Sequence, residues 1–242
     1  MKNLKTLFGL LLLLVVMWSC SNDENASTNN QLRLKASATY SPSANRSNIN
    51  ALMNNNVVLS SFKINIKEIE FEFAEINDND NDDSDDNGFF DGDDEFELNG
   101  PFELDLLNQS ETITTVTIPN GTYEEVEFSL DKSNNSASSM NNKSIEIRGT
   151  INGTPFIFWH DIEEEFEIDY EDANQNLVIN NNSFDLVFNF DLNQVLSQVD
   201  LSNATDNDGD GIIEINPNDT DGNQSLADLL KDKIEDACDL DD

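Results

Sequence analysis

One short segment near the C-terminus carries acidic residues at a spacing that suits a calcium ion. It reads Asp206-Asn207-Asp208-Gly209-Asp210-Gly211-Ile212-Ile213-Glu214. Acids at relative positions 1, 3 and 5, with glycine at 6 and isoleucine at 8, match the first half of an EF-hand-type loop. Oxygen atoms at alternate positions converge on one point as such a chain curls, and calcium prefers oxygen ligands. The spacing therefore predicts a Ca²⁺ site.

Oxygens beyond the first three carboxylates are expected to complete this site. Ile212 would offer its main-chain carbonyl, and Ile213 would attach the loop to the core. The segment departs from an EF-hand at relative position 12, where Pro217 replaces the bidentate glutamate. Asp219 or Asp221 is expected to supply the missing ligand. The full expected ligand set is Asp206, Asp208, Asp210, Ile212, Glu214, Asp219 and Asp221.

The expected role of this calcium is structural. A bound ion would lock the segment between the last strand and a C-terminal helix, and extracellular modules bind calcium with a Kd of about 10⁻⁴–10⁻³ M. The alternative is an acidic turn that stays solvated without an ion. A second acidic tract, at 77–95, lacks this order and is expected to be a disordered insertion between two strands. Weak cation binding at Asp78, Asp80 and Asp82 is the alternative for that tract.

Residues for catalysis are sparse. His160 is the only histidine, and no Gly-x-Ser-x-Gly motif accompanies it. Glu163–Glu165 could include a carboxylate pair for glycoside hydrolysis, but 49 acidic residues leave that choice without discriminating power. The sequence holds neither a glycine-rich phosphate loop nor a zinc-type set of cysteines and histidines. We therefore expect no catalytic residues.

The N-terminus carries the strongest targeting signal. Lys2 and Lys5 precede an apolar run, and the small Ser19 precedes Cys20. The apolar run is too short to cross a bilayer, which needs about 20 residues. This arrangement predicts a lipoprotein signal peptide over residues 1–19. Cleavage would leave Cys20 at the new N-terminus, where acyl chains such as palmitate would anchor the protein to a membrane without spanning it.

Cysteine usage and net charge limit the partners. An acylated Cys20 leaves Cys238 without a disulfide partner in the chain, and the alternative is a Cys20–Cys238 disulfide in a secreted protein. The formal net charge of -37 repels phosphate backbones, so nucleic-acid binding is not expected. The same charge attracts cations, above all Ca²⁺.

Alternation of apolar and polar residues through most of the chain predicts β-strands. The main runs are 32–40, 62–73, 102–106, 126–130, 145–147, 166–170 and 184–192. Within 62–73 the apolar phase slips by one residue, which predicts a β-bulge near Lys67–Glu68. Asn152-Gly153 predicts a hairpin, and Pro119-Asn120-Gly121 predicts a turn into the strand that follows. Such a series of strands and short turns indicates an antiparallel β-sandwich, transthyretin-like or immunoglobulin-like.

Helical spacing is found only late in the chain. It spans 192–199 and then 226–238, with Ser225 and Asp228 as the expected cap of the second helix. The expected domain organisation is a signal peptide at 1–19, a flexible tether at 20–31, a β-sandwich at 32–200 with the acidic insertion at 77–95, and an acidic calcium-type loop with a C-terminal helix at 201–242.

Four features together resemble uncharacterised β-sandwich surface lipoproteins of the Bacteroidota type. The first three are the lipoprotein start, Phe102-Glu103-Leu104-Asp105-Leu106-Leu107, and Ile118-Pro119-Asn120-Gly121-Thr122-Tyr123 before a strand, and a strand pair around Phe62–Phe73 adds to them. Ser21-Asn22-Asp23-Glu24 after the cysteine is similar to the surface-export signal of that group, although Met17 and Trp18 depart from its usual lipobox. The resemblance covers about 32–192. It implies the sandwich fold and an outer-membrane, surface-facing location, with a periplasm-facing anchor as the alternative, and it implies no known activity.

Two classes of function follow from these observations. The first is a non-enzymatic, membrane-anchored lipoprotein that binds a glycan or a surface protein, with Trp159 or Tyr170 as a candidate aromatic platform. The second is a carbohydrate-active hydrolase that uses paired carboxylates in a concave pocket. A purely structural envelope protein would have neither feature.

Overall fold

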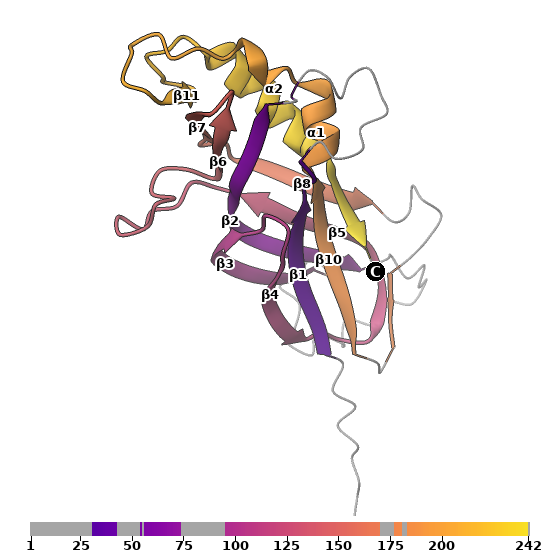
Figure 1. Ribbon diagram of the computed structural model, residues 1–242. Coiled ribbons are helices and arrows are strands. Elements are labelled where there is room, and N and C mark those ends of the chain that lie inside the picture. The colour runs from indigo at the N-terminus through magenta and orange to yellow at the C-terminus, as the bar shows by residue number, and fades with distance from the viewer. Residues whose placement is uncertain are drawn as a thin grey trace, which may run out of the picture.

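The structure is a computed structural model that describes residues 31–42, 54, 56–73, 95–169, 177–180 and 183–241. It confirms the expected fold class: two β-sheets pack together as a β-sandwich, with two short α-helices late in the chain (Figure 1). No helix in these ranges is long and apolar enough to cross a membrane.

The smaller sheet has four strands in the order β12-β10-β1-β4. Their bounds are β1 (Gln31–Thr39), β4 (Ser110–Thr117), β10 (Phe184–Asp191) and β12 (Cys238–Asp241). The neighbours pair antiparallel except for β1 and β10, which run parallel over their whole length. The two central strands of this sheet are therefore about 150 residues apart in the sequence, from Lys35 to Asp185 for example.

The larger sheet has the order β11-β7-β6-β2-β5-β8, with β3 paired to β2 and β9 paired to β5. Its strands are β2 (Val57–Phe73), β3 (Glu95–Asp105), β5 (Gly121–Leu130), β6 (Ile145–Ile151), β7 (Thr154–His160), β8 (Glu164–Asp169), β9 (Leu177–Ile179) and β11 (Ile213–Ile215). The pair β11–β7 is parallel and the others are antiparallel.

Strand β2 organises the larger sheet because it pairs with three different strands. Its first half pairs with β6, and its second half pairs with β3 and β5. The register against both β3 and β5 shifts between Ile66 and Glu68, which confirms the predicted bulge at Lys67. The extra residue lets Phe62, Ile64 and Ile66 on one side of it, and Ile69 and Phe71 on the other, all be buried.

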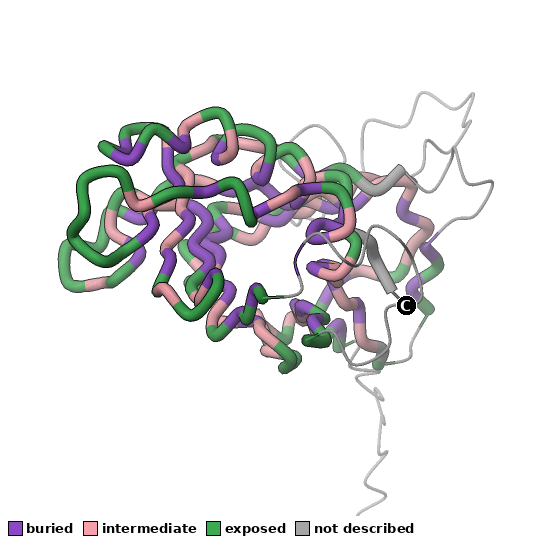
Figure 2. Tube along the Cα trace, turned by 45° about the horizontal axis from the view of Figure 1, so that its top comes forward, coloured by how far each residue is buried: buried purple, intermediate pink, exposed green. Residues whose placement is uncertain are grey.

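Aromatic rings fill the space between the two sheets. Phe128 of the larger sheet stacks on Phe166, with ring centroids 4.6 Å apart, and contacts Phe188 of the smaller sheet at 4.5 Å. Phe62 and Phe190 form a second contact between the sheets, at 5.3 Å. Buried and non-buried residues alternate along the strands that supply these rings (Figure 2). Each sheet therefore has one face in a common core.

The two predicted turns have different outcomes. Asn152 and Gly153, with φ values of 53° and 84°, join β6 and β7 as the predicted hairpin, because a two-residue turn of this kind needs positive φ at both positions. The turn at Pro119 is present, but it leads from β4 in the smaller sheet to β5 in the larger one. The Tyr123 hydroxyl donates a hydrogen bond of 3.0 Å to the Pro119 carbonyl across this corner.

The two helices occupy the predicted stretches, with corrections at the ends of the second. Helix α1 (Leu192–Gln198) begins at Asp191, whose carboxylate accepts hydrogen bonds from the next turn. Helix α2 (Gln224–Glu235) begins after Asn223, so the expected cap at Ser225 is wrong and Ser225 lies inside the helix. Cys238 was expected on the same helix but begins β12, where it pairs with Phe190. The segment after residue 200 thus contributes an edge strand to each sheet.

Candidate metal centre

The loop that leads into β11 brings three of the expected ligands together. Asp206, Asp208 and Asp210 each present a carboxylate oxygen, and these oxygens lie within 4.8 Å of one another. The loop follows a short 3-10 helix, η2 (Leu201–Asn203), and ends at β11. Asp206 is half-buried, and the other two aspartates are exposed to solvent.

Backbone geometry curls this loop around the carboxylates. Gly209 and Gly211 have φ values of 80° and 94°, which other residues rarely adopt. The two oxygens of Asp206 accept hydrogen bonds from the amides of Gly209 (2.7 Å) and Gly211 (2.9 Å). Asp210 similarly accepts the Ile212 amide at 2.8 Å. Each carboxylate is thus oriented by the loop itself.

The end of the loop is attached to the larger sheet. Ile213 and Ile215 are buried, and Ile213 pairs with Phe156 on β7. Ile212 is exposed and precedes the strand. Asp210, the last carboxylate of the cluster, is three residues before Ile213, so β11 sets the position of the cluster relative to the core.

The structure places Asp219 and Asp221 in a different environment from the cluster. Both are buried, and their carboxylates accept hydrogen bonds from backbone amides. Asp219 accepts from Asn216, Gly222 and Asn223, and Asp221 accepts from Asn207, Asp208 and Glu214. Burial by itself would raise the pKa of Asp221, but these three amides hold that pKa below its usual value. Both residues organise the loop from inside.

Glu214 lies on β11 between the buried isoleucines and is itself half-buried. Burial raises its pKa, and the negative charges of Asp210, Asp221 and Asp208 raise it further. Glu214 therefore lies within the electrostatic field of the cluster, although its carboxylate is not one of the three that converge.

Asn223 is a structural residue of the loop that the sequence pattern did not indicate. Its side-chain amide donates to the carbonyls of Thr205 (3.0 Å) and Glu214 (2.7 Å), and its side-chain oxygen accepts the Thr205 amide. It thus connects the two ends of the loop at the point where α2 begins. In the sequence, Asn223 is only an asparagine just before a predicted helix. An ordinary N-cap would look the same, so the sequence did not indicate its role in the loop.

The other candidate residues are scattered. His160 ends β7, with its Nε2 atom 3.6 Å from Asp228 of α2. Trp159, a candidate for the aromatic platform, is half-buried. In the described ranges, the large apolar side chains that are exposed are aliphatic: Val58, Val178, Ile212 and Leu229. Tyr170 and Cys20 lie outside the described residues, as does the tract 77–95 up to Glu95, where β3 begins.

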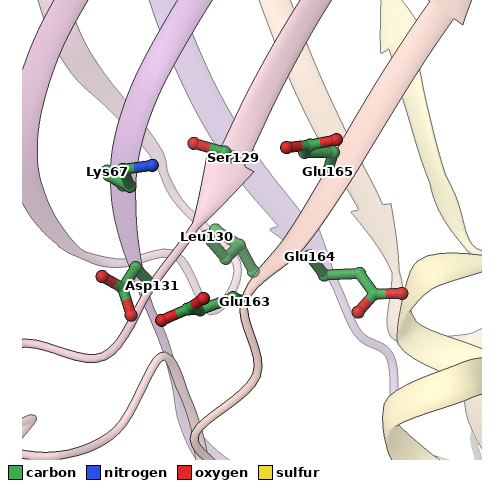
Figure 3. Close-up of a pocket in the computed structure, with 7 residues that line it drawn as sticks. All are labelled: Lys67, Ser129, Leu130, Asp131, Glu163, Glu164 and Glu165. Atoms are coloured by element: carbon green, nitrogen blue, oxygen red, sulfur yellow. The ribbon is translucent and has the colours of Figure 1, made fainter.

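A cavity of about 520 Å³ lies where β5 and β8 meet. Its lining consists of Lys67, Ser129, Leu130, Asp131, Glu163, Glu164 and Glu165 (Figure 3). The expected carboxylates of the hydrolase alternative therefore do line a concave surface. Among the described residues, none that lines this cavity carries an aromatic ring.

A second acidic feature, which sequence analysis missed, covers the outer side of the larger sheet. Glutamates at alternate positions of β2, β3, β5 and β8 share this side, and we call them the glutamate face: Glu68, Glu70, Glu72, Glu95, Glu97, Glu125, Glu127, Glu165 and Glu167. The alternation was visible in each strand. Only the strand pairing places the four sets beside one another.

In the part of the chain that the structure describes, carboxylates on the glutamate face lie mainly beside other carboxylates. A hydrogen bond with Glu97, followed by burial and repulsion, raises the pKa of Glu68 to about 7. Burial, then the neighbouring carboxylates, also raises the pKa of Glu70 and Glu127. Lys67 lies 3.7 Å from Glu68, at the edge of the face.

Comparison with protein-family models, with curated protein sequences and with solved structures finds no match to this chain.

Proposed function

We propose that this protein is a non-enzymatic, lipid-anchored β-sandwich of the outer membrane, displayed at the cell surface, with a structural calcium site in its C-terminal loop. The observation that carries the proposal is the convergence of the Asp206, Asp208 and Asp210 carboxylates on one point. Like-charged oxygens at this separation repel one another unless a cation lies between them. Calcium is the cation whose ligand chemistry matches an all-oxygen loop.

The site is open, which favours weak binding. Asp219 and Asp221 are buried, whereas the three carboxylates of the cluster reach solvent, so the protein ligands expected here are those three carboxylates and the Ile212 carbonyl, with water for the remainder. Such a site suits a Kd of about 10⁻⁴–10⁻³ M, the range of extracellular modules. The role is structural because Ile213, three residues after the last of these carboxylates, is buried in strand β11.

Calcium should stabilise the protein against heat. At ten to a hundred times its Kd, a ligand of the native state adds about 1.4–2.7 kcal/mol, which raises the Tm of a domain of this size by about 3–10 °C. The variant to compare is Asp210→Asn, because asparagine keeps the oxygen that accepts the Ile212 amide and removes only the charge. Thermal unfolding followed by circular dichroism, with calcium and with EDTA, measures both.

The matched control is Asp228→Asn, which removes an exposed aspartate from the nearby helix α2. This control should keep the calcium-dependent shift in Tm, and Asp210→Asn should lose most of it. An equal calcium-dependent rise in Tm in both variants would mean that calcium does not bind at the 206–210 loop.

The lipid anchor rests on the sequence around Cys20. Cys20→Ser should release the protein from membranes, because one serine cannot carry the acyl chains that hold it there. Fractionation of cells into soluble and membrane material measures this, with Cys238→Ser as the matched control that should stay in the membrane. Retention of Cys20→Ser in the membrane fraction would contradict the anchor.

The binding role follows from the anchor and the fold: a sandwich held outside the cell presents its surfaces to glycans or to other surface proteins. The absence of an aromatic ring among the described residues of the acid-lined cavity weighs against the hydrolase alternative. Hydrolysis of a glycan by the purified protein, lost on replacement of Glu163 or Glu165, would favour the hydrolase over the binding role.

A further inference from the structure

The strand register of the larger sheet sets carboxylates directly opposite one another. Glu70 lies opposite Glu97 on one side and Glu127 on the other, and Glu127 lies opposite Glu167. Directly opposed residues of antiparallel strands have Cβ atoms about 4.5–5.5 Å apart, where like charges destabilise the sheet. A row of four glutamates across four strands therefore needs positive charge near it.

A second row lies alongside the first. Glu72 is opposite Glu95 and Glu125. Between the two rows is a hollow of about 120 Å³ whose lining consists of Glu70, Glu72, Glu95, Glu125 and Glu127. The hollow is thus lined by carboxylate-bearing side chains alone, which offer oxygen ligands and no positive charge.

Ser129 is the independent feature that indicates a ligand. Ser129 is the next residue after Glu125 and Glu127 at the alternate positions of β5 that face the outer side of the sheet. It carries a hydroxyl instead of a carboxylate. The residue is 8% exposed, and its Oγ atom has no hydrogen-bond partner among the described residues. Ser129 lines the acid-lined cavity, and Figure 3 shows its side chain between the Lys67 ammonium and the Glu165 carboxylate. A buried hydroxyl without a partner is unfavourable unless something binds it.

The positions beside Ser129 are suited to a shared ion. Ser129 is opposite Glu68 on β2 and opposite Glu165 on β8. Neighbouring strands lie about 4.8 Å apart, so two long glutamate side chains flank the serine from both sides. Calcium binds protein oxygens at about 2.4 Å, and carboxylates on strands that flank a hydroxyl are suitable further ligands.

We propose that the glutamate face is a second calcium-binding surface, with a site formed by the Ser129 hydroxyl and the carboxylates of Glu68 and Glu165. It is separate from the loop at 206–214 and does not depend on the proposed lipid anchor. A divalent cation fits this face better than a basic polypeptide, because one Ca²⁺ between opposed carboxylates neutralises two charges and also accepts a neutral oxygen ligand.

The experiment measures calcium binding in the Asp210→Asn background, where the loop is silenced. Full-length protein in detergent is dialysed against radioactive calcium in about 0.15 M potassium chloride, which screens non-specific attraction. Saturable binding should remain. Ser129→Ala should weaken it about two- to tenfold, as expected for one lost polar ligand, and Glu68→Gln with Glu165→Gln should abolish it.

Two further variants separate a site from a general charge effect. Glu111→Gln on β4 removes the same charge from the smaller sheet and should leave the affinity unchanged. Lys67→Met removes a competing positive charge and should tighten calcium binding about two- to fivefold. Weaker calcium binding in Lys67→Met would overturn the proposal, because removal of a nearby positive charge cannot weaken a cation site of this kind.

Stability supplies a second readout that does not depend on dialysis. In EDTA, Ser129→Ala should unfold at the same or a higher temperature than its parent, because it removes a buried unpartnered oxygen. In calcium its Tm shift should be smaller than that of the parent.

Two binding results would contradict the proposal. If calcium binds equally to Ser129→Ala, Glu68→Gln/Glu165→Gln and Glu111→Gln, the glutamate face attracts only a diffuse layer of counter-ions. Absent calcium binding with uptake of polylysine would instead make it a docking surface for basic partners. Either result overturns the proposal, while the loop is judged separately by Asp210→Asn alone.

Discussion

Individual buried acids in this protein are held by specific donors. Glu146 has a fully buried side chain that accepts hydrogen bonds from Arg148 Nε (2.7 Å), Arg148 Nη2 (3.0 Å) and the Lys143 ammonium. Burial alone would raise the pKa of Glu146, but the hydrogen bonds from Arg148 and Lys143 outweigh it and lower that pKa. Asp221 follows the same principle with backbone amides. These acids contrast with the glutamate face, where donors are scarce.

The lowered pKa of Glu146 leads to a prediction about acid stability. A carboxyl with a lower pKa in the folded state adds stability above its unfolded pKa, near 4.5, and loses it as the pH falls through the folded value. Glu146→Gln should therefore lower the free energy of unfolding by about 1–3 kcal/mol at pH 7, with a smaller loss at pH 3. Urea unfolding at both pH values measures this difference, and Glu111→Gln is the control. A loss that is the same at both pH values would contradict the assigned role.

At the scale of elements, one buried side chain connects the start of the larger sheet to the end of α1. Asn54 is 3% exposed, and its amide donates to the carbonyls of Leu196 (2.7 Å) and Val199 (2.6 Å). Its oxygen accepts the Leu201 amide at 2.9 Å. Carbonyls at the end of a helix have no partner within that helix, so Asn54 satisfies groups that α1 and η2 leave open.

Replacement of Asn54 should lower the free energy of unfolding, because it removes all three of these hydrogen bonds. Asn54→Ala leaves buried backbone groups without partners, and we expect a loss of about 1–3 kcal/mol or more in the free energy of unfolding. Asn56→Ala is the matched control, because Asn56 is exposed and bonds only to another exposed asparagine, Asn152. The midpoint of urea unfolding compares the two. Similar midpoints would mean that Asn54 does not hold the helix end.

At the scale of the whole molecule, the acidic residues fall into groups with different consequences. Some organise a loop from inside, as Asp219 and Asp221 do. Others lie close together on the curled segment of that loop, as Asp206, Asp208 and Asp210 do. The glutamate face spreads over four strands of one sheet. The acidic residues behind the net charge of -37 therefore form groups with separate roles. Only some of these groups are accessible to cations.

The amino-acid sequence by itself determined the features that depend on neighbours along the chain. Alternation predicted the strands, the phase slip predicted the bulge at Lys67, and positive φ at Asn152 and Gly153 produced the predicted hairpin. The cluster at 206–210 could be predicted for the same reason, since its carboxylates lie on one continuous curled segment.

Tertiary structure alone decided which strands pair and which hydrogen-bond partners each buried polar side chain finds. The parallel pairing of β1 with β10, the path from β4 to β5 between sheets, and the alignment of glutamates across β2, β3, β5 and β8 have no local signal. Many strands here share one alternating pattern, so packing of the common core selects among them. Asp219 and Asp221 illustrate the same limit: their carboxylates bind amides that only the folded loop brings to them.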